Sequence, residues 1–355
     1  MKLATLEDGS LDGRLTIVSR DLAWACAAND IAPNLLRALE LWDEVSEQLE
    51  QRSSLLNRGA IPSAFPFDPA RAMAPLPRAP QWLDGSAFPS HGERMVKAFG
   101  LSNDSLQVNR PLMYQGCSDN FLGARTAVPL PSEEHGIDFE AELAVITANV
   151  PMAAPPDECA RRIRLLVLVD DVSLRNLILE EMPLGFGMIQ CKPTSVLSPV
   201  CVTPDELGPG WDGQRVHLNL TCRVNGRTLG TLSASEMRYS FGELIAHAAR
   251  TRFLAAGTIV GSGTFSNYDA SLGVGCLAEA RALELLNTGK IATPWLRFGD
   301  RVEMEMFDKN HQSLFGAIDH TSAQYRGNGS PAGEWNQNQS TAADRTRADE
   351  RRTHR

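Results

Sequence analysis

The chain has 355 residues, with 34 lysines and arginines against 43 aspartates and glutamates and a formal net charge of −9. This acidic balance argues against nucleic acid or an anionic membrane as the main partner, and a hydrophobic content of 43% excludes disorder as a description of the whole chain. The N-terminus lacks a signal-peptide pattern and no run of about 18 apolar residues occurs, so we expect a cytoplasmic protein. The seven cysteines are scattered without zinc spacing, which predicts small buried thiols in a reducing compartment.

Residues 1–60 predict a small α+β domain. Asp-Gly turn signals at positions 8 and 12 adjoin short apolar stretches, as in antiparallel strands. From residue 33 to about 56 apolar residues recur every three or four positions, which predicts one helix that Gly59 ends. Six prolines within residues 61–80 indicate an extended linker to a second domain.

Residues 81–326 predict a larger, mainly β domain. Asn225-Gly226 is typical of a hairpin turn, and Ser240 with Glu243 forms a capping box that begins a helix. The expected strands are 139–146, 165–169, 217–224, 302–306 and about 314–318. Residues 327–355 have almost no apolar content and predict a disordered tail.

The segment that begins at Asp138 carries two glutamates in apolar surroundings. On a strand, Glu140 and Glu142 share one face, which continues as Ala144 and Ile146. Two carboxylates on an apolar face repel each other unless a cation lies between them, so a hard divalent metal is one interpretation and a solvated face is the other. Glu303 and Glu305 provide an internal comparison, because their strand face includes Arg301 and needs no metal.

Two further groups follow in the chain. Asp171 stands directly after the apolar run 165–169, where it can complete an oxygen-rich metal site or simply form a turn or helix cap. Lys192 lies in an otherwise uncharged run and is a candidate for stabilising developing negative charge.

In this order, the residues resemble the fumarylacetoacetate hydrolase family, whose members carry E-x-E on a strand, then an aspartate in N-D-x-S-x-R, then a lysine. The separations here are 29 residues from Glu142 to Asp171 and 21 from Asp171 to Lys192. Residues 261–267 resemble the family's S-G-T-x-S segment, and Gly299-Asp300 precedes a late strand as in the family. The resemblance covers about residues 80–320 and implies an α+β, β-rich fold with a mixed, rolled sheet, preceded by a smaller N-terminal α+β domain.

The resemblance also implies roles for individual residues. Glu140, Glu142 and Asp171 would be metal ligands, with Asp84 as a fourth, and Lys192 would face the substrate's carbonyl oxygens. His91, seven residues after Asp84, would be the general base, although a lone histidine can equally be structural. The orienting carboxylate would be Glu279, and the substrate pocket would be lined by Tyr114, Arg175 and Thr264.

These roles predict a metal-dependent hydrolase that cleaves the carbon–carbon bond of a 1,3-diketone acid such as an acylpyruvate or fumarylacetoacetate. Water activated by His91 would attack one carbonyl, and a metal-bound enolate would leave. The carboxylate ligands favour Mg²⁺ over Zn²⁺, and Mn²⁺ or Ca²⁺ would also suit them. The resemblance further implies a homodimer that acts in aromatic-compound catabolism on a small oxo-acid substrate.

Three departures from the family pattern keep other functions open. Asn176 stands where the family has aspartate, Ile178 where many members have a substrate-contacting glutamine, and Lys192 is followed by Pro-Thr rather than Ser-Phe. The alternatives are a tautomerase, an oxo-acid decarboxylase or a hydratase with the same metal site. A non-catalytic binding protein with the same fold is a further alternative.

Overall fold

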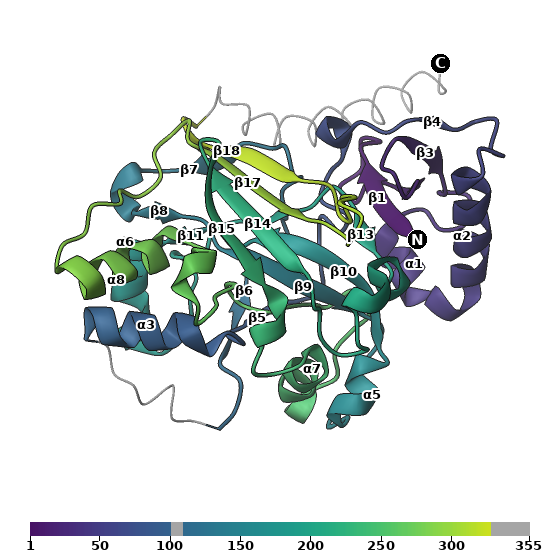
Figure 1. Ribbon diagram of the computed structural model, residues 1–355. Coiled ribbons are helices and arrows are strands. Elements are labelled where there is room, and N and C mark those ends of the chain that lie inside the picture. The colour runs from purple at the N-terminus through teal and green to yellow at the C-terminus, as the bar shows by residue number, and fades with distance from the viewer. Residues whose placement is uncertain (101–108, 328–355) are drawn as a thin grey trace, which may run out of the picture.

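A large mixed β-sheet forms the centre of the computed structural model, which describes residues 1–100 and 109–327 (Figure 1). Within these residues the sheet has eleven strands, and its only parallel pair is β16 with β5. Its strands in spatial order are β4 (Phe65–Pro66), β3 (Trp24–Ala27), β2 (Arg14–Val18), β1 (Lys2–Leu6), β13 (Cys201–Val202), β10 (Ile163–Asp170), β9 (Ala141–Thr147), β16 (Ile259–Gly261), β5 (Trp82–Gly85) and β6 (Met113–Gly116), with β12 (Val196–Leu197) paired to β10.

The N-terminal unit continues this sheet through the antiparallel pairing of β1 with β13. The expected antiparallel strands are present as β1 to β3. The single helix expected over residues 33–56 is two helices, α1 (Leu35–Glu40) and α2 (Trp42–Asn57), separated by Leu41. The apolar repeat is continuous across this break because both helices pack against the same core, so periodicity alone could not reveal it. The proline-rich residues 61–80 contain only β4 and a short 3₁₀ turn at Pro69–Arg71.

A second sheet of five strands packs in the same body (Figure 1). Its order is β15 (Arg227–Ser233), β14 (Asn219–Val224), β17 (Arg301–Met306), β18 (Ile318–Gln324) and β7 (Val128–Leu130). The predicted hairpin joins β14 to β15, and both turn residues have positive φ, 51° at Asn225 and 76° at Gly226, as a type I′ turn requires. A short pair, β8 (Ile137–Asp138) with β11 (Ser173–Leu174), lies apart from both sheets.

Longer helices lie outside the sheets. In Figure 1, α3 (Pro89–Phe99) and α8 (Leu277–Thr288) lie together at one end, and α5 (Pro156–Ala160) packs with α7 (Phe241–Ala248) along one side. The capping box of Ser240 and Glu243 is present at the start of α7, as predicted. A further helix, α6 (Arg175–Glu181), follows β11. None of the described helices has both the length and the apolar character needed to cross a bilayer.

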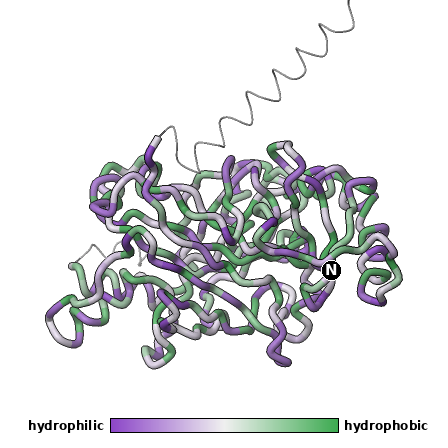
Figure 2. Tube along the Cα trace, turned by 90° about the horizontal axis from the view of Figure 1, so that it is seen from above, coloured by the Kyte–Doolittle hydropathy of each residue, from purple (hydrophilic) through white to green (hydrophobic). Residues whose placement is uncertain are grey.

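The core lies on both faces of the main sheet. On β9, Leu143 and Val145 enter one apolar cluster, whereas Ala144 and Ile146 enter the other. Figure 2 shows hydrophobic and hydrophilic residues interspersed along much of the chain. Because β9 is covered on both faces, a charged side chain on it is taken out of water.

Three predictions about local structure need correction or fall outside the described chain. The last strand is Ile318–Gln324 rather than 314–318, because its inward side includes the polar residues His320 and Ser322, which hide the apolar alternation. Cys117 is partly exposed, while the other six cysteines are buried. The predicted disordered tail, residues 327–355, lies outside the described residues except for position 327.

Candidate metal centre and active site

Three carboxylates from the region of β5, β9 and β10 meet at one end of the main sheet, where β16 separates β5 from β9. Asp84 lies on β5, Glu142 on β9, and Asp171 directly after β10. One oxygen of each lies within 4.8 Å of the others, and all three side chains are buried. Asp171 is neither a helix cap nor an exposed turn residue, because α6 begins at Arg175 behind Leu174. The sheet therefore unites residues that are 87 positions apart in sequence (171 − 84).

Glu142 gives this trio its chemical character. It is 0% exposed, and neither carboxylate oxygen has a hydrogen-bond partner among the described residues. Burial, followed by the nearby carboxylates, raises the pKa of Glu142 and of Asp84 well above the usual range. An unpartnered buried carboxylate beside two others needs either a proton or a cation, and three convergent carboxylate oxygens suit a hard divalent metal. The residues thus fit such an ion.

Two glycines allow Asp84 to lie against the neighbouring strand. A Cβ atom at Gly261 would collide with Asp84 Oδ1 and with the Trp82 ring. Gly263 has a φ of +77°, and its backbone N–H donates to Asp84 Oδ1 at 3.1 Å. This conformation favours glycine, so the S-G-T segment helps to orient a carboxylate of the trio.

Lys192 joins Glu140 to this trio. Its Nζ donates to Glu140 Oε2 and Asp171 Oδ2, and at 2.8 Å to Ser173 Oγ. Burial alone would lower the pKa of Lys192, but the two carboxylates outweigh it and raise that pKa. Burial would raise the pKa of Glu140, yet Lys192 and Arg175 lower it. Lys192 is therefore a buried cation shared between two carboxylates.

Arg175 anchors Glu140 from the other side. Its guanidinium donates to Glu140 Oε1 at 2.7 Å and to Asp138 Oδ2 at 2.8 Å. Asp138 also accepts the backbone N–H groups of Leu277 and Ala278, in the first turn of α8. Glu140 directly precedes β9 rather than lying within it, and both of its oxygens contact these cations.

The other predicted substrate residues lie around the trio. The Tyr114 hydroxyl, on β6, donates to Asp171 Oδ2 at 2.6 Å, and Lys192 Nζ lies 5.2 Å from the centre of the Tyr114 ring. Burial and the neighbouring carboxylates raise the pKa of Tyr114 well above its usual value. Thr264 is buried directly after Gly263. Ser195 holds the other oxygen of Asp171 at 3.0 Å.

His91 lies in the first turn of α3 and faces Glu279 on α8. The distance from His91 Nδ1 to Glu279 Oε2 is 3.7 Å, and Glu279 is 0% exposed. The other oxygen, Oε1, accepts from Ser266 Oγ at 2.5 Å and from Arg94. Burial would raise the pKa of Glu279, but His91, Ser266 and Arg94 together lower it. The structure thus brings the predicted base and its predicted orienting carboxylate together.

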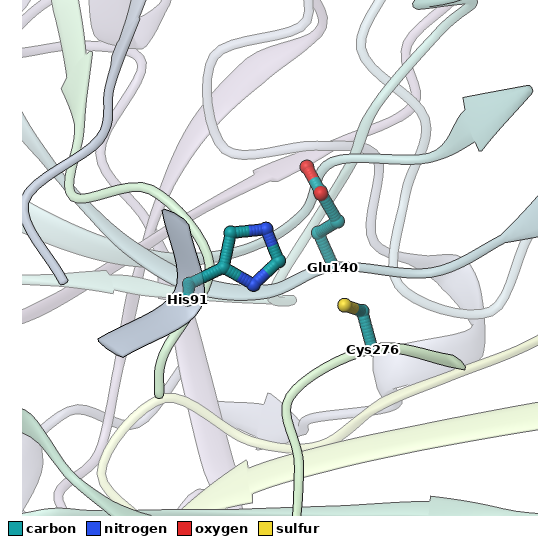
Figure 3. A group of neighbouring side chains, drawn as sticks. All are labelled: His91, Glu140 and Cys276. Carbon is teal, nitrogen blue, oxygen red and sulfur yellow. The ribbon is translucent and has the colours of Figure 1, made fainter. Parts of the chain in front are cut away.

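A second group of side chains lies beside this pair. His91, Glu140 and Cys276 each place one polar atom within 4.8 Å of the others. Figure 3 shows the edge of the imidazole that carries both nitrogens turned toward Glu140 and Cys276. Cys276 is the N-cap of α8, and its Sγ accepts the backbone N–H of Glu279 at 3.4 Å.

Several supporting residues were missed by sequence reasoning. Asp138, Ser173, Ser195, Arg94 and Cys276 contact the predicted site residues, as described above. Asp138 and Ser173 lie inside the quoted motifs, so their position was a usable signal. Arg94, three residues after His91, had no such signal in the sequence.

Glu303 and Glu305, the internal comparison for the two glutamates of the site, have the partly exposed setting that was expected. Glu303 pairs with the exposed Arg301 at 3.1 Å, and Glu305 is not fully buried.

The chain belongs to the fumarylacetoacetate hydrolase family. Residues 81–321 match the family described as fumarylacetoacetate (FAA) hydrolase C-terminal, and residues 1–78 match fumarylacetoacetase N-terminal domain 2. The family resemblance predicted from the motifs is therefore confirmed, as is the β-rich α+β fold with an N-terminal domain.

Individual relatives are distant. This chain is 25% identical to an uncharacterised Pyrococcus abyssi protein over 157 residues. The aligned region covers 43% of this chain and 67% of that protein. A match of the same length is 24% identical to a mitochondrial oxaloacetate tautomerase of Rattus norvegicus and covers only 48% of it. Two crystal structures share the fold over 92% of this chain and all of theirs: a putative HpcE protein of Mycobacterium smegmatis, with TM-score 0.64 and 21% identity, and a maleylpyruvate hydrolase of Sphingobium sp. SYK-6 in complex with manganese(II) and pyruvate, with TM-score 0.61 and 15% identity.

Proposed function

We propose that this protein is a metal-dependent hydrolase that cleaves the carbon–carbon bond of an acylpyruvate-type 1,3-diketone acid. The observation that carries the proposal is the pair of His91 and Glu279 beside the buried carboxylates, because hydrolysis needs a base for water as well as a cation site. The maleylpyruvate hydrolase of the same fold, which binds manganese(II) and pyruvate, supports this substrate class.

A divalent cation held by Asp84, Glu142 and Asp171, with Glu140 nearby, would act as a Lewis acid toward two oxygens of the substrate. We propose Mg²⁺, since all these ligands are carboxylates, and Mn²⁺ is the second choice. The unpartnered oxygens of Glu142 support the assignment independently of any relative.

The protein residues divide the remaining work. His91 accepts the proton of the attacking water, and Glu279, 3.7 Å from Nδ1, stabilises the protonated ring. Lys192 supplies positive charge for an oxygen that becomes negative as the carbon–carbon bond breaks, and Arg175 holds Glu140 in place. Tyr114 and Thr264 border the space for the substrate. The oxygen of the water adds to one carbonyl carbon and the bond from that carbon to the neighbouring carbon breaks. The departing carbon takes up the proton that His91 accepted, so the two products are carboxylic acids.

A tautomerase is the second candidate, because the rat relative is an oxaloacetate tautomerase. The departure at Ile178 favours the same alternative, since it replaces a substrate-contacting residue of the family. Asn176 donates to the backbone oxygen of Glu134 at 2.6 Å, so this departure serves local structure instead. Tautomerisation would need the cation and a base but no bound water.

The product distinguishes the two reactions. The purified protein with Mg²⁺ or Mn²⁺ would be given a panel of acylpyruvates and, separately, enol-oxaloacetate. Hydrolysis removes the diketone absorbance and yields two acids by chromatography, whereas tautomerisation changes only the keto-to-enol ratio. Hydrolysis of none of the acylpyruvates, together with rapid ketonisation of oxaloacetate, would refute the hydrolase.

We also propose a homodimer, with residues 175–192, which comprise α6 and the loop after it, at its interface. This segment exposes a group of large apolar side chains: Leu179, Met182, Leu184, Phe186 and Ile189. The loop is held in shape, because the Glu181 carboxylate accepts the backbone N–H groups of residues 189, 190 and 191. An ordered loop with this much exposed apolar surface is typical of a contact between subunits.

A further inference from the structure

Glu279 has one carboxylate oxygen that the protein holds and one that faces His91. Its Oε1 accepts hydrogen bonds from Ser266 Oγ at 2.5 Å and from the Arg94 guanidinium. Its Oε2 has no hydrogen-bond partner among the described residues, and His91 Nδ1, 3.7 Å away, has none among them either. Whether Oε2 faces the ring therefore depends on the groups that hold Oε1.

Arg94 connects α3 to two other segments of the site. It lies on α3 three residues after the proposed base, and its side chain is only 11% exposed. Its Nη1 donates to Glu279 on α8 and, at 3.3 Å, to Ser266 Oγ. Its Nη2 donates to the backbone oxygens of residues 267 and 268 at 2.6 Å and 3.1 Å. A planar guanidinium can meet four acceptors in this way, whereas a lysine ammonium has only three donors.

We propose that Arg94 is a positioning residue, which orients Glu279 so that Oε2 accepts the Nδ1–H of His91 and ring atom Nε2 is left to accept a proton from water. A carboxylate beside a general-base histidine selects the ring tautomer in this way. The separation of 3.7 Å is longer than a hydrogen bond, and catalytic contacts of this kind commonly shorten when the substrate binds.

The neighbouring serines support the same orientation. Ser266 gives its hydroxyl proton to Glu279 Oε1, so at 2.7 Å it accepts from Ser90 rather than donating to it. Two donors thus hold Oε1, and a rotation of the Glu279 carboxylate would break both hydrogen bonds. Because Glu279 is 0% exposed, no bulk water could replace them.

A purely structural link between α3 and α8 would also account for the four hydrogen bonds of Arg94. The two roles differ in what the loss of Arg94 does to the His91 ring. The effect on turnover rests on the proposed function, whereas the tautomer of the ring does not. The experiment therefore measures the tautomer and the turnover separately.

The tautomer would be read by nitrogen-15 NMR of protein labelled at histidine, with saturating Mg²⁺ and at about pH 8.5, so that imidazole rings are neutral. Protonated and unprotonated ring nitrogens have well separated shifts, and His91→Ala identifies the signals of this ring. The wild type should have Nδ1 protonated. Arg94→Met should move the proton to Nε2 in a substantial fraction of the molecules.

Two further variants make this result specific. Ser266→Ala removes the other donor to Glu279 Oε1 without changing charge, so it should fold and should shift part of the His91 signal in the same direction. The matched control is Arg281→Met. Arg281 also lies on α8, but it donates to a backbone oxygen and stacks 4.1 Å from an indole ring, so its loss should leave the His91 signals unchanged.

Kinetics on an acylpyruvate give the second readout. Arg94→Met should lower kcat by about 10–100-fold, less than the loss of the base itself, with Mg²⁺ affinity unchanged and KM within about threefold of wild type. In a Glu279→Gln background the same change should cost less than about threefold, because no carboxylate is left to orient. Arg281→Met should keep kcat within about twofold of wild type.

A His91 ring that keeps its wild-type tautomer in both Arg94→Met and Ser266→Ala overturns the proposal, and Ser266→Ala alone decides if Arg94→Met does not fold. A loss of kcat that is undiminished in the Glu279→Gln background also overturns it. The changed tautomer together with the coupled loss of kcat supports it. A wild type that hydrolyses no acylpyruvate would refute the proposed function, and the tautomer would still decide the role of Arg94.

Discussion

Replacing Glu142 by glutamine should make the metal-free protein more stable while it weakens metal binding. The carboxylate is 0% exposed and has two other acids within 4.8 Å. Two like charges at 4.8 Å repel by about 3.5 kcal/mol at an effective dielectric constant of 20, so the substitution removes up to about 7 kcal/mol of repulsion from its two pairs. Protonation of the wild type limits this gain, and we expect about 2–3 kcal/mol and a rise of a few degrees in Tm.

The pH dependence gives the sign of the effect. Folding raises the pKa of Glu142 and Asp84, so above the ordinary carboxylate pKa of about 4 the native state binds more protons than the unfolded chain. Metal-free wild type therefore loses stability as the pH rises from about 4 through the raised pKa values. The stabilisation by Glu142→Gln should be small near pH 4–5 and should grow toward pH 8.

Thermal unfolding with EDTA and with Mg²⁺, together with calorimetric titration of Mg²⁺, measures both effects. The wild type should be stabilised by Mg²⁺ much more than the variant, because a ligand stabilises the state that binds it. Glu305→Gln is the matched control and should change neither quantity. Equal Mg²⁺ affinity of wild type and Glu142→Gln, or a metal-free variant less stable than wild type at pH 8, would refute the reasoning.

Further predictions concern Lys192, His91 and the exposed loop. Lys192→Met should destabilise the metal-free protein by about 3–5 kcal/mol, because it leaves the buried carboxylates of Glu140 and Asp171 without this cation. A Tm equal to or above that of wild type would contradict this. His91→Ala should lower kcat by about 10²–10⁴-fold with Mg²⁺ affinity unchanged in calorimetry, and a loss of only a few-fold would exclude His91 as the base. Phe186→Ser should shift the protein from dimer to monomer in sedimentation velocity while Phe253→Ser, at a side chain 70% exposed elsewhere, should not; two unchanged sedimentation profiles would place the interface elsewhere.

The parts of the fold that sequence predicts well are those with a single dominant local signal. The strands now seen as β9 and β10 were predicted within two residues at each end, because an apolar run that is buried on both faces leaves a continuous pattern. The Asn225-Gly226 hairpin and the cap at Ser240 were predicted because each has a local signal of its own, an Asn-Gly pair in the turn and a capping box at the start of the helix. β18 was misplaced because its inward residue His320 bonds to the buried Asp170 at 2.7 Å, and this polar contact between distant strands has no local signature.

The structure brings the predicted site residues close together, but the sequence does not show which of the acids pair with cations of the protein. Strand alternation suggested that Glu140 and Glu142 would act together, yet Glu140 lies one residue before β9 and pairs with Lys192 and Arg175. The two cations that pair with Glu140, Arg175 and Lys192, lie 35 and 52 residues after it in the sequence. These distant residues decide that Glu140 has a cation partner in the protein and that Glu142 has none. No spacing rule contains that information.

The charges of the site explain why this division matters. Asp84, Asp138, Glu140, Glu142 and Asp171 are five buried carboxylates, and they face two cations, the buried Lys192 and the partly buried Arg175. The cations neutralise Asp138 and Glu140 and partly Asp171, which leaves the excess of negative charge concentrated at Asp84 and Glu142. A divalent ion that entered among all five carboxylates evenly would have to displace Lys192 or Arg175. We therefore expect a divalent ion to bind at the trio, with Lys192 at its edge, where our proposal has it act on a substrate oxygen.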